Sequence, residues 1–251
     1  MLLPRTDDST AMRREIPMLC IGHSHVASLA AAASQQGLAL TAINFWYPPG
    51  ALVRENDKWK LSDETRQRIG RHAGPVFSLI GGACYAQLGM LVHPRPWDFV
   101  LPTTEELPLA PDTELIPYDA VKQVLSGLMQ EYLEITLQVR DAATNALFHI
   151  EPPPPCADAK RMLPHIPWPL FPGMRREIAP ALFRYKLWRL QSSILEAQCK
   201  EHGIGFVRYP DIASDEQGFL APAYFGDGAH GNPAYGALVL EQIRWLHEAS
   251  V

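Results

Sequence analysis

The sequence lacks the features of several large classes of protein. It contains no run of 18 apolar residues, which a membrane-spanning helix would need, and no apolar segment follows its charged first residues as it does in a signal peptide. Its net charge of −5 includes no basic cluster, so nucleic acid is a poor candidate for a partner. We therefore expect a cytoplasmic protein with no membrane or nucleic-acid partner, in which residues 1–16 form a flexible leader.

Cysteine is also scarce, whereas proline is abundant. The four cysteines are far apart and include no Cys-x-x-Cys pair, which suits a reducing compartment better than a disulfide framework. Proline accounts for 23 of the 251 residues and is concentrated in residues 94–117 and 152–180. Such stretches cannot form long helices or central strands, so we predict two long loops, which are often functional in a compact domain.

Short apolar runs alternate with helical periodicity along the rest of the chain. The runs predict strands at residues 18–22, 38–45, 76–80, 146–150 and 205–209. The periodic segments predict helices at residues 26–36, 62–70, 118–141, 181–202 and 232–247, with Ser62 and Asn232 as N-caps. In residues 118–141 the apolar residues recur at spacings of three and four, which predicts one buried face made of Val121, Val124, Leu128, Tyr132, Ile135 and Val139. This alternation favours a parallel sheet covered on both faces. We predict one domain over residues 17–251, a three-layer α/β/α sandwich with a parallel sheet of about five strands.

Three short segments lie where such a sheet binds ligands, outside the carboxyl ends of its strands. They are Gly22-His23-Ser24-His25, Gly81-Gly82-Ala83-Cys84 and Asp227-Gly228-Ala229-His230. A serine in a strand-to-helix turn is exposed, and the nearby backbone N–H groups can hold a developing oxyanion. The step of three residues from Asp227 to His230 would let the carboxylate orient the imidazole as a base toward Ser24.

The order and positions of these segments resemble the SGNH (GDSL-like) hydrolase family over residues 19–237. The anchors are the serine block, a glycine block at Gly50, Ile80-Gly81-Gly82, and Asp227-x-x-His230. The resemblance implies an SGNH hydrolase-like fold of flavodoxin-like topology. It also implies a serine-dependent esterase, lipase or carbohydrate deacetylase, although some relatives transfer acyl groups instead. In that reading Ser24 is the nucleophile, His230 the base and Asp227 its orienting partner, with no metal or organic cofactor.

Two positions depart from the family pattern. The family usually has aspartate where His23 stands, and an asparagine that donates to the oxyanion where Ala83 stands. These departures leave open a weakened or inactive relative that binds a glycan or another ligand, or that transfers acyl groups.

Several candidate residues also have a simpler interpretation. Serine after a strand is commonly a helix cap, and the Asp-Gly pair at Asp227 is a common turn. Gly50 follows two prolines and suits a turn as well as an oxyanion donor. Asn44 could replace the missing asparagine or bond the loop backbone, and His25 could cap the helix or line the pocket.

A metal-dependent hydrolase is the third hypothesis. His23 and His25 form a His-x-His pair of a spacing that can bind a metal, although the later strands end without further matching ligands. Aromatic residues on or near the predicted loops, such as Trp46 and Tyr47, could stack on sugar rings or simply pack the loops.

The preferred function from sequence is ester hydrolysis, with an O-acetyl group on a saccharide as the candidate substrate. The partner would then be a small-molecule or carbohydrate ester. We expect the backbone N–H groups of Ser24 and Gly50 to be the oxyanion donors. The other residues expected to line the oxyanion and substrate site are Gly82, Ala83, His25 and Asn44.

Overall fold

A five-stranded parallel sheet forms the centre of the computed structural model, which describes residues 17–102, 107–166 and 175–249. Its strands are β1 (Met18–Gly22), β2 (Leu40–Asn44), β5 (Val76–Leu79), β8 (Leu147–Ile150) and β9 (Gly205–Val207). They lie in the order β2-β1-β5-β8-β9, which is the flavodoxin-like order. The predicted strands and fold class are confirmed, while the predicted leader lies outside the described residues.

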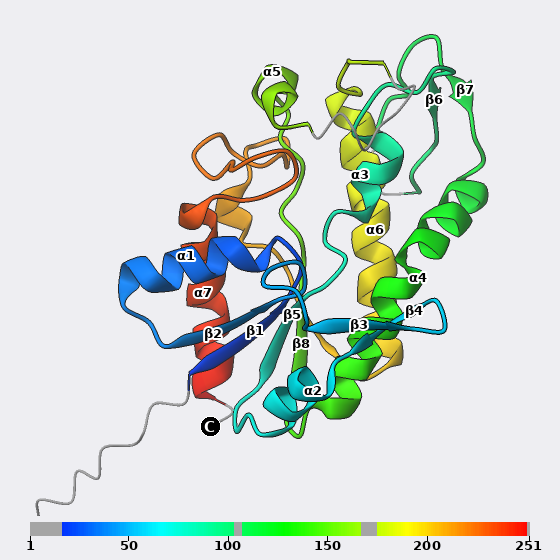
Figure 1. Ribbon diagram of the computed structural model, residues 1–251. Coiled ribbons are helices and arrows are strands. Elements are labelled where there is room, and N and C mark those ends of the chain that lie inside the picture. The colour runs from blue at the N-terminus through cyan, green and yellow to red at the C-terminus, as the bar shows by residue number, and fades with distance from the viewer. Residues whose placement is uncertain (1–16, 103–106, 167–174, 250–251) are drawn as a thin grey trace, which may run out of the picture.

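Helices cover both faces of the sheet (Figure 1). On one face lie α1 (Val26–Gln36) and α7 (Pro233–Glu248), and on the other lie α2 (Asp63–Gly70), α4 (Tyr118–Ala142) and α6 (Ala181–Glu201). Side chains of β1 alternate between the two faces: Met18 and Cys20 belong to the core under α1 and α7, and Leu19 and Ile21 to the opposite core. Since both faces are covered, every residue of β1 is buried.

The predicted helix starts at Ser62 and Asn232 are confirmed. The Ser62 side chain accepts a hydrogen bond from the Thr65 backbone N–H, and the Asn232 side chain accepts one from that of Tyr235. None of the helices that the structure describes is long and apolar enough to cross a membrane.

The buried face of α4 differs from the predicted one over its first turns. Val124, expected to be buried, is 54% exposed, and Leu128 is half-buried. Leu125 and Met129 are buried instead, because this half of α4 packs against α3 and α6 and not directly on the sheet.

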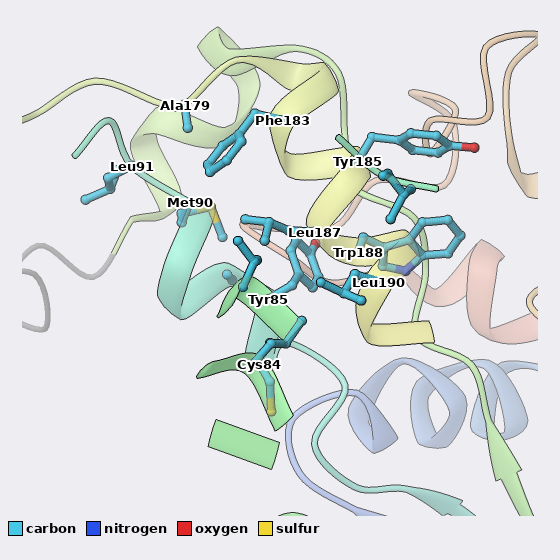
Figure 2. Close-up of a cluster of buried hydrophobic side chains, with 14 of the residues drawn as sticks. Cys84, Tyr85, Met90, Leu91, Ala179, Phe183, Tyr185, Leu187, Trp188 and Leu190 are labelled. Atoms are coloured by element: carbon cyan, nitrogen blue, oxygen red, sulfur yellow. The ribbon is translucent and has the colours of Figure 1, made fainter. Parts of the chain in front are cut away.

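Several short elements were not predicted from the sequence. The hairpin of β3 (Leu52–Glu55) and β4 (Lys58–Leu61) follows β2, and α3 (Cys84–Gly89) follows β5. Figure 2 shows the side chains of Cys84, Tyr85 and Met90 gathered with those of Phe183, Leu187 and Leu190 on α6. The described parts of the proline-rich stretches are mainly irregular, as predicted, and contain the short elements β6 (Trp97–Asp98), β7 (Glu114–Leu115) and α5 (Ala159–Met162) and a 3-10 turn at Leu163–His165. Residues 103–106 and 167–174 of these stretches lie outside the described residues.

Two buried cations on α6 hold these proline-rich segments in place. Lys186 Nζ lies 2.6 Å from the Asp98 carboxylate and also donates to the carbonyls of Phe99 and Pro108. The Arg184 guanidinium donates to the carbonyl oxygens of Cys156, Ala157 and Ala179. Each cation is completely buried, so its hydrogen bonds offset the loss of hydration.

Candidate active site

Ser24 lies in the turn between β1 and α1, at the carboxyl end of a central strand. The helix begins here, since the Val26 N–H donates to the His23 carbonyl and the Ala27 N–H to the Ser24 carbonyl. The preceding Gly22 is required by close packing, because a Cβ there would lie 2.6 Å from the Leu79 carbonyl oxygen. Ser24 is half-buried, so its hydroxyl stands at the sheet edge where ligands bind in such folds.

Asp227 and His230 lie in a tight turn that precedes α7. The His230 N–H donates to the Asp227 carbonyl at 2.6 Å, and the Gly226 N–H donates to the His230 carbonyl at 2.9 Å. An isolated antiparallel bridge between Phe225 and Gly231 closes the turn. In this turn the side chains of Asp227 and His230 lie on the same side, in hydrogen-bond contact, as the step of three residues between them predicts.

The three predicted residues form one hydrogen-bonded chain. The Ser24 hydroxyl lies 2.7 Å from His230 Nε2, and His230 Nδ1 is hydrogen-bonded to Asp227 Oδ1. A carboxylate at Nδ1 selects the tautomer that carries its proton there, so Nε2 is left to accept the serine proton. The bond to His230 also holds the pKa of Asp227 below its ordinary value. Both partners reach the surface, since their side chains are 32% (His230) and 57% (Asp227) exposed.

Close packing of α7 on α1 brings these distant segments together. A Cβ at Gly236 on α7 would lie 2.3 Å from the backbone carbonyl oxygen of Ser28 on α1, so glycine allows the two helices to touch near their first turns. Asn232 caps α7 and also donates to the Ala223 carbonyl at 2.8 Å. His230, two residues before this cap, therefore lies against Ser24 although 206 positions separate them.

The loop after β5 is fixed by a buried glutamine that the sequence analysis missed. Gln191 on α6 is fully buried; its Nε2 donates to the Gly82 carbonyl at 2.9 Å, and its Oε1 accepts from the Tyr85 N–H at 2.7 Å. Gly81 has a φ of +73°, and its N–H donates to His23 Nδ1 at 3.3 Å. The available signal was a glutamine four residues after Leu187 and three before Ile194, a spacing that places it on the same face of α6 as these apolar residues.

The other predicted oxyanion and substrate residues lie in different places. Gly82 is buried beside His25. Asn44 Oδ1 accepts from the Trp46 N–H at 2.8 Å, which is the loop-bonding role. Gly50 lies in the exposed part of the same loop with a φ of +114°. Ala83 is half-buried at the start of α3, and its methyl group has no donor to offer. Which backbone groups would hold an oxyanion stays a prediction.

His23 and His25 face different surroundings. The His23 ring packs among Phe45, Trp46 and Tyr132, at centroid distances of 5.0–5.2 Å, while the His25 ring packs against His230. Burial lowers the pKa of His23 to about 4 and that of His25 to about 3. Across the described ranges, no three His, Cys, Asp or Glu side chains are grouped as metal ligands. The geometry therefore lends no support to a metal site at His23 and His25.

The cysteines show no sign of a reactive thiol. All four are free and buried. Cys84, which follows the glycine loop, has its pKa raised to about 12 by burial, whereas a reactive thiol needs a lowered pKa and access to solvent.

Comparisons with known proteins give structural likenesses of low identity. No family model and no curated protein matches the sequence.

Several similar solved structures are GDSL-like acylhydrolases or esterases. A GDSL-like lipase from Bacteroides thetaiotaomicron is 15% identical, with a TM-score of 0.43 over 94% of this chain and 90% of that chain. A carbohydrate acetylesterase from Sinorhizobium meliloti is 12% identical, with a TM-score of 0.43 over 92% of this chain and 99% of that one. The periplasmic domain of a lipopolysaccharide acetyltransferase from Salmonella Paratyphi A is 11% identical, with a TM-score of 0.45 over 92% and 83% of the two chains. At these values the likenesses assign no activity to this chain.

Proposed function

We propose that this protein is a serine-dependent ester hydrolase, and that its substrate is an O-acetyl ester of a saccharide. The observation that carries the proposal is the hydrogen-bonded chain from Ser24 Oγ through His230 to Asp227, with 2.7 Å between the hydroxyl oxygen and Nε2. A serine hydroxyl needs such a base to become a nucleophile at neutral pH.

The proposed reaction has two halves that use the same base. Ser24 Oγ attacks the ester carbonyl while His230 Nε2 takes its proton, and Asp227 stabilises the resulting imidazolium. The tetrahedral intermediate then expels the alcohol, which receives the proton from His230. Water next attacks the acyl-serine with His230 as base, which releases the acid and restores the Ser24 hydroxyl.

The oxyanion would be held mainly by backbone groups. We assign this role to the N–H groups of Ser24, near the positive end of α1, and of Gly50. Ala83 supplies no side-chain donor, and the loss of one donor lowers turnover by about 10²- to 10³-fold. We therefore expect slow but measurable turnover.

The choice of a saccharide rests on exposed aromatic side chains beside the serine block. Trp46 and Tyr47 follow β2 and are 56% and 79% exposed, and the Trp46 ring lies 5.0 Å from that of His23, which precedes Ser24. Exposed aromatic faces can stack on the apolar face of a sugar ring, whereas a long acyl chain needs a more enclosed apolar pocket.

A panel of short-chain esters and acetylated sugars tests the proposal. Wild type should hydrolyse at least one of them, and Ser24→Ala and His230→Ala should abolish the activity while retaining the wild-type melting temperature. Ser34→Ala changes an exposed serine at the far end of α1 and should behave as wild type. Ester hydrolysis that survives in Ser24→Ala would refute the mechanism.

Ala83 also favours a second candidate, a relative that transfers an acyl group or only binds the acylated ligand. Adding free sugar alcohols to the assay separates these possibilities. Products acylated on the added alcohol would indicate transfer, and saturable binding of an acetylated sugar without turnover would indicate a binding protein.

A further inference from the structure

The residue after the serine, His25, fills the space between His230 and the loop after β5, which contains Gly81 and Gly82. The residue is buried and retains 6% of its accessible surface. Its ring centroid lies 4.7 Å from that of His230, with the two rings tilted by 56°. On its other side lies the Gly82 backbone, where a Cβ would come within 2.6 Å of Cδ2 and 2.8 Å of Nε2. Only glycine at position 82 leaves room for the ring.

Packing, and not hydrogen bonding at Nε2, sets the position of the His25 ring. Its Nε2 is buried and has no hydrogen-bond partner among the described residues. The backbone beneath the ring is held by Ser28, whose Oγ donates to the His25 carbonyl at 3.0 Å. The His25 ring therefore packs between the Gly82 backbone and the His230 ring.

The charge state of His25 suits a place beside a catalytic imidazole. Burial first, and the neighbouring His230 second, lower the pKa of His25 to about 3. The ring is neutral at neutral pH, so it does not repel the imidazolium that His230 would become when it takes the serine proton.

We propose that His25 is a positioning residue for His230: its ring, seated on Gly82, holds the His230 imidazole so that Nε2 meets the Ser24 hydroxyl. This inference rests on the proposed function. Because His25 acts through His230 and not on bound substrate, its loss should lower kcat and leave KM nearly unchanged. Displacement of a reacting group by about 1 Å can lower the rate by about 100-fold.

The test is a double-mutant cycle between His25 and Gly82, measured on the ester that the panel identifies. His25→Ala removes the ring, and Gly82→Ala adds the methyl group that would displace it. Each single change should lower kcat by about 10- to 100-fold. In the His25→Ala background the methyl group has room, so Gly82→Ala should have little further effect. Ser34→Ala, a change at the exposed far end of α1, should keep the wild-type kcat.

Two kinetic results would overturn the inference. One is a wild-type kcat in His25→Ala. The other is an equal loss from Gly82→Ala in both backgrounds, which would show that the methyl group acts on another part of the site. Melting temperatures accompany each variant, and His25→Leu, which fills part of the space without a planar ring, takes the place of His25→Ala if the latter does not fold.

A crystal structure of His25→Ala separates this inference from the proposed function. We expect His230 Nε2 to leave hydrogen-bond distance of Ser24 Oγ. If wild type hydrolyses no ester, the proposed function fails, and the crystal structure still decides the positioning role. If His230 keeps its place without the His25 ring, the positioning role is refuted whatever the activity.

Discussion

Asp227→Asn removes the charge behind His230 while keeping a side chain of the same size and shape. Without the carboxylate, the imidazolium formed during the reaction loses its counter-ion, and the amide can also favour the wrong tautomer of His230. The bond to His230 keeps the pKa of Asp227 below its ordinary value, so the carboxylate is charged throughout the neutral range.

The size of the effect follows from the exposure of the pair. Two unit charges about 4 Å apart interact by about 1 kcal/mol in water and about 4 kcal/mol where the effective dielectric constant is near 20. The Asp227 side chain is 57% exposed and that of His230 32%, which places the pair between these limits. A loss of about 1–4 kcal/mol corresponds to a fall in kcat of about 5- to 1,000-fold. Removal of a serine nucleophile typically has a far larger effect, about 10⁶-fold.

The assay compares kcat for wild type, Asp227→Asn and Ser24→Ala on one ester at several pH values. Asp57→Asn is the matched control, because the Asp57 side chain is 99% exposed on the β3–β4 hairpin and has a φ of +61°, which asparagine tolerates. If Asp227→Asn lowers kcat as far as Ser24→Ala does, solvent does not weaken the interaction between Asp227 and His230 as their exposure implies. If it leaves kcat unchanged, Asp227 has no part in the reaction.

Three further predictions concern the oxyanion site, substrate binding and acid stability. Ala83→Asn should raise kcat, by up to about 10²- to 10³-fold if it restores a missing donor, and a wild type that is already fast and slows on this change would refute the idea. Trp46→Ala should raise KM for an acetylated oligosaccharide but not for a small acetyl ester, while Trp245→Ala, which removes another exposed tryptophan (69%) on α7, should change neither; equal KM values for the oligosaccharide in wild type and Trp46→Ala would exclude stacking. Burial lowers the pKa of three histidines to about 3 or 4: His23, His25 and His149. The unfolded chain therefore binds up to three more protons between about pH 6.5 and pH 4, and the free energy of unfolding should fall with decreasing pH by up to about 4 kcal/mol per unit. Urea unfolding across this range measures the slope, which should decrease in His149→Phe; an unchanged slope in that variant would contradict the assignment.

Local sequence patterns were sufficient to predict the main strands and helices. The five buried residues of β1 form a continuous apolar run, which is typical of a strand covered on both faces. Ser62 and Asn232 cap their own helices through backbone groups three residues ahead, so these helix starts depend only on neighbouring sequence.

The elements missed from sequence depend on distant partners. The β3–β4 hairpin is held by α4, where Gln138 exchanges hydrogen bonds with the Leu61 N–H and the Trp59 carbonyl, and Glu134 pairs with Lys58 at 3.1 Å. The buried stripe of α4 was misplaced over its first turns for the same reason, because α3 and α6 decide which of its side faces is covered.

The sequence by itself determined the residue types of the candidate site and one piece of its geometry, the Asp-x-x-His turn that sets Asp227 beside His230. The meeting of His230 with Ser24 was decided by the tertiary structure, since it depends on Gly236 letting α7 touch α1 at the Ser28 carbonyl. The same holds for the loop that Gln191 clamps and for the His25 ring on Gly82. Contacts of this kind join segments far apart in the chain. They are created by the packing of helices and strands, so the spacing of residues along the sequence could not predict them.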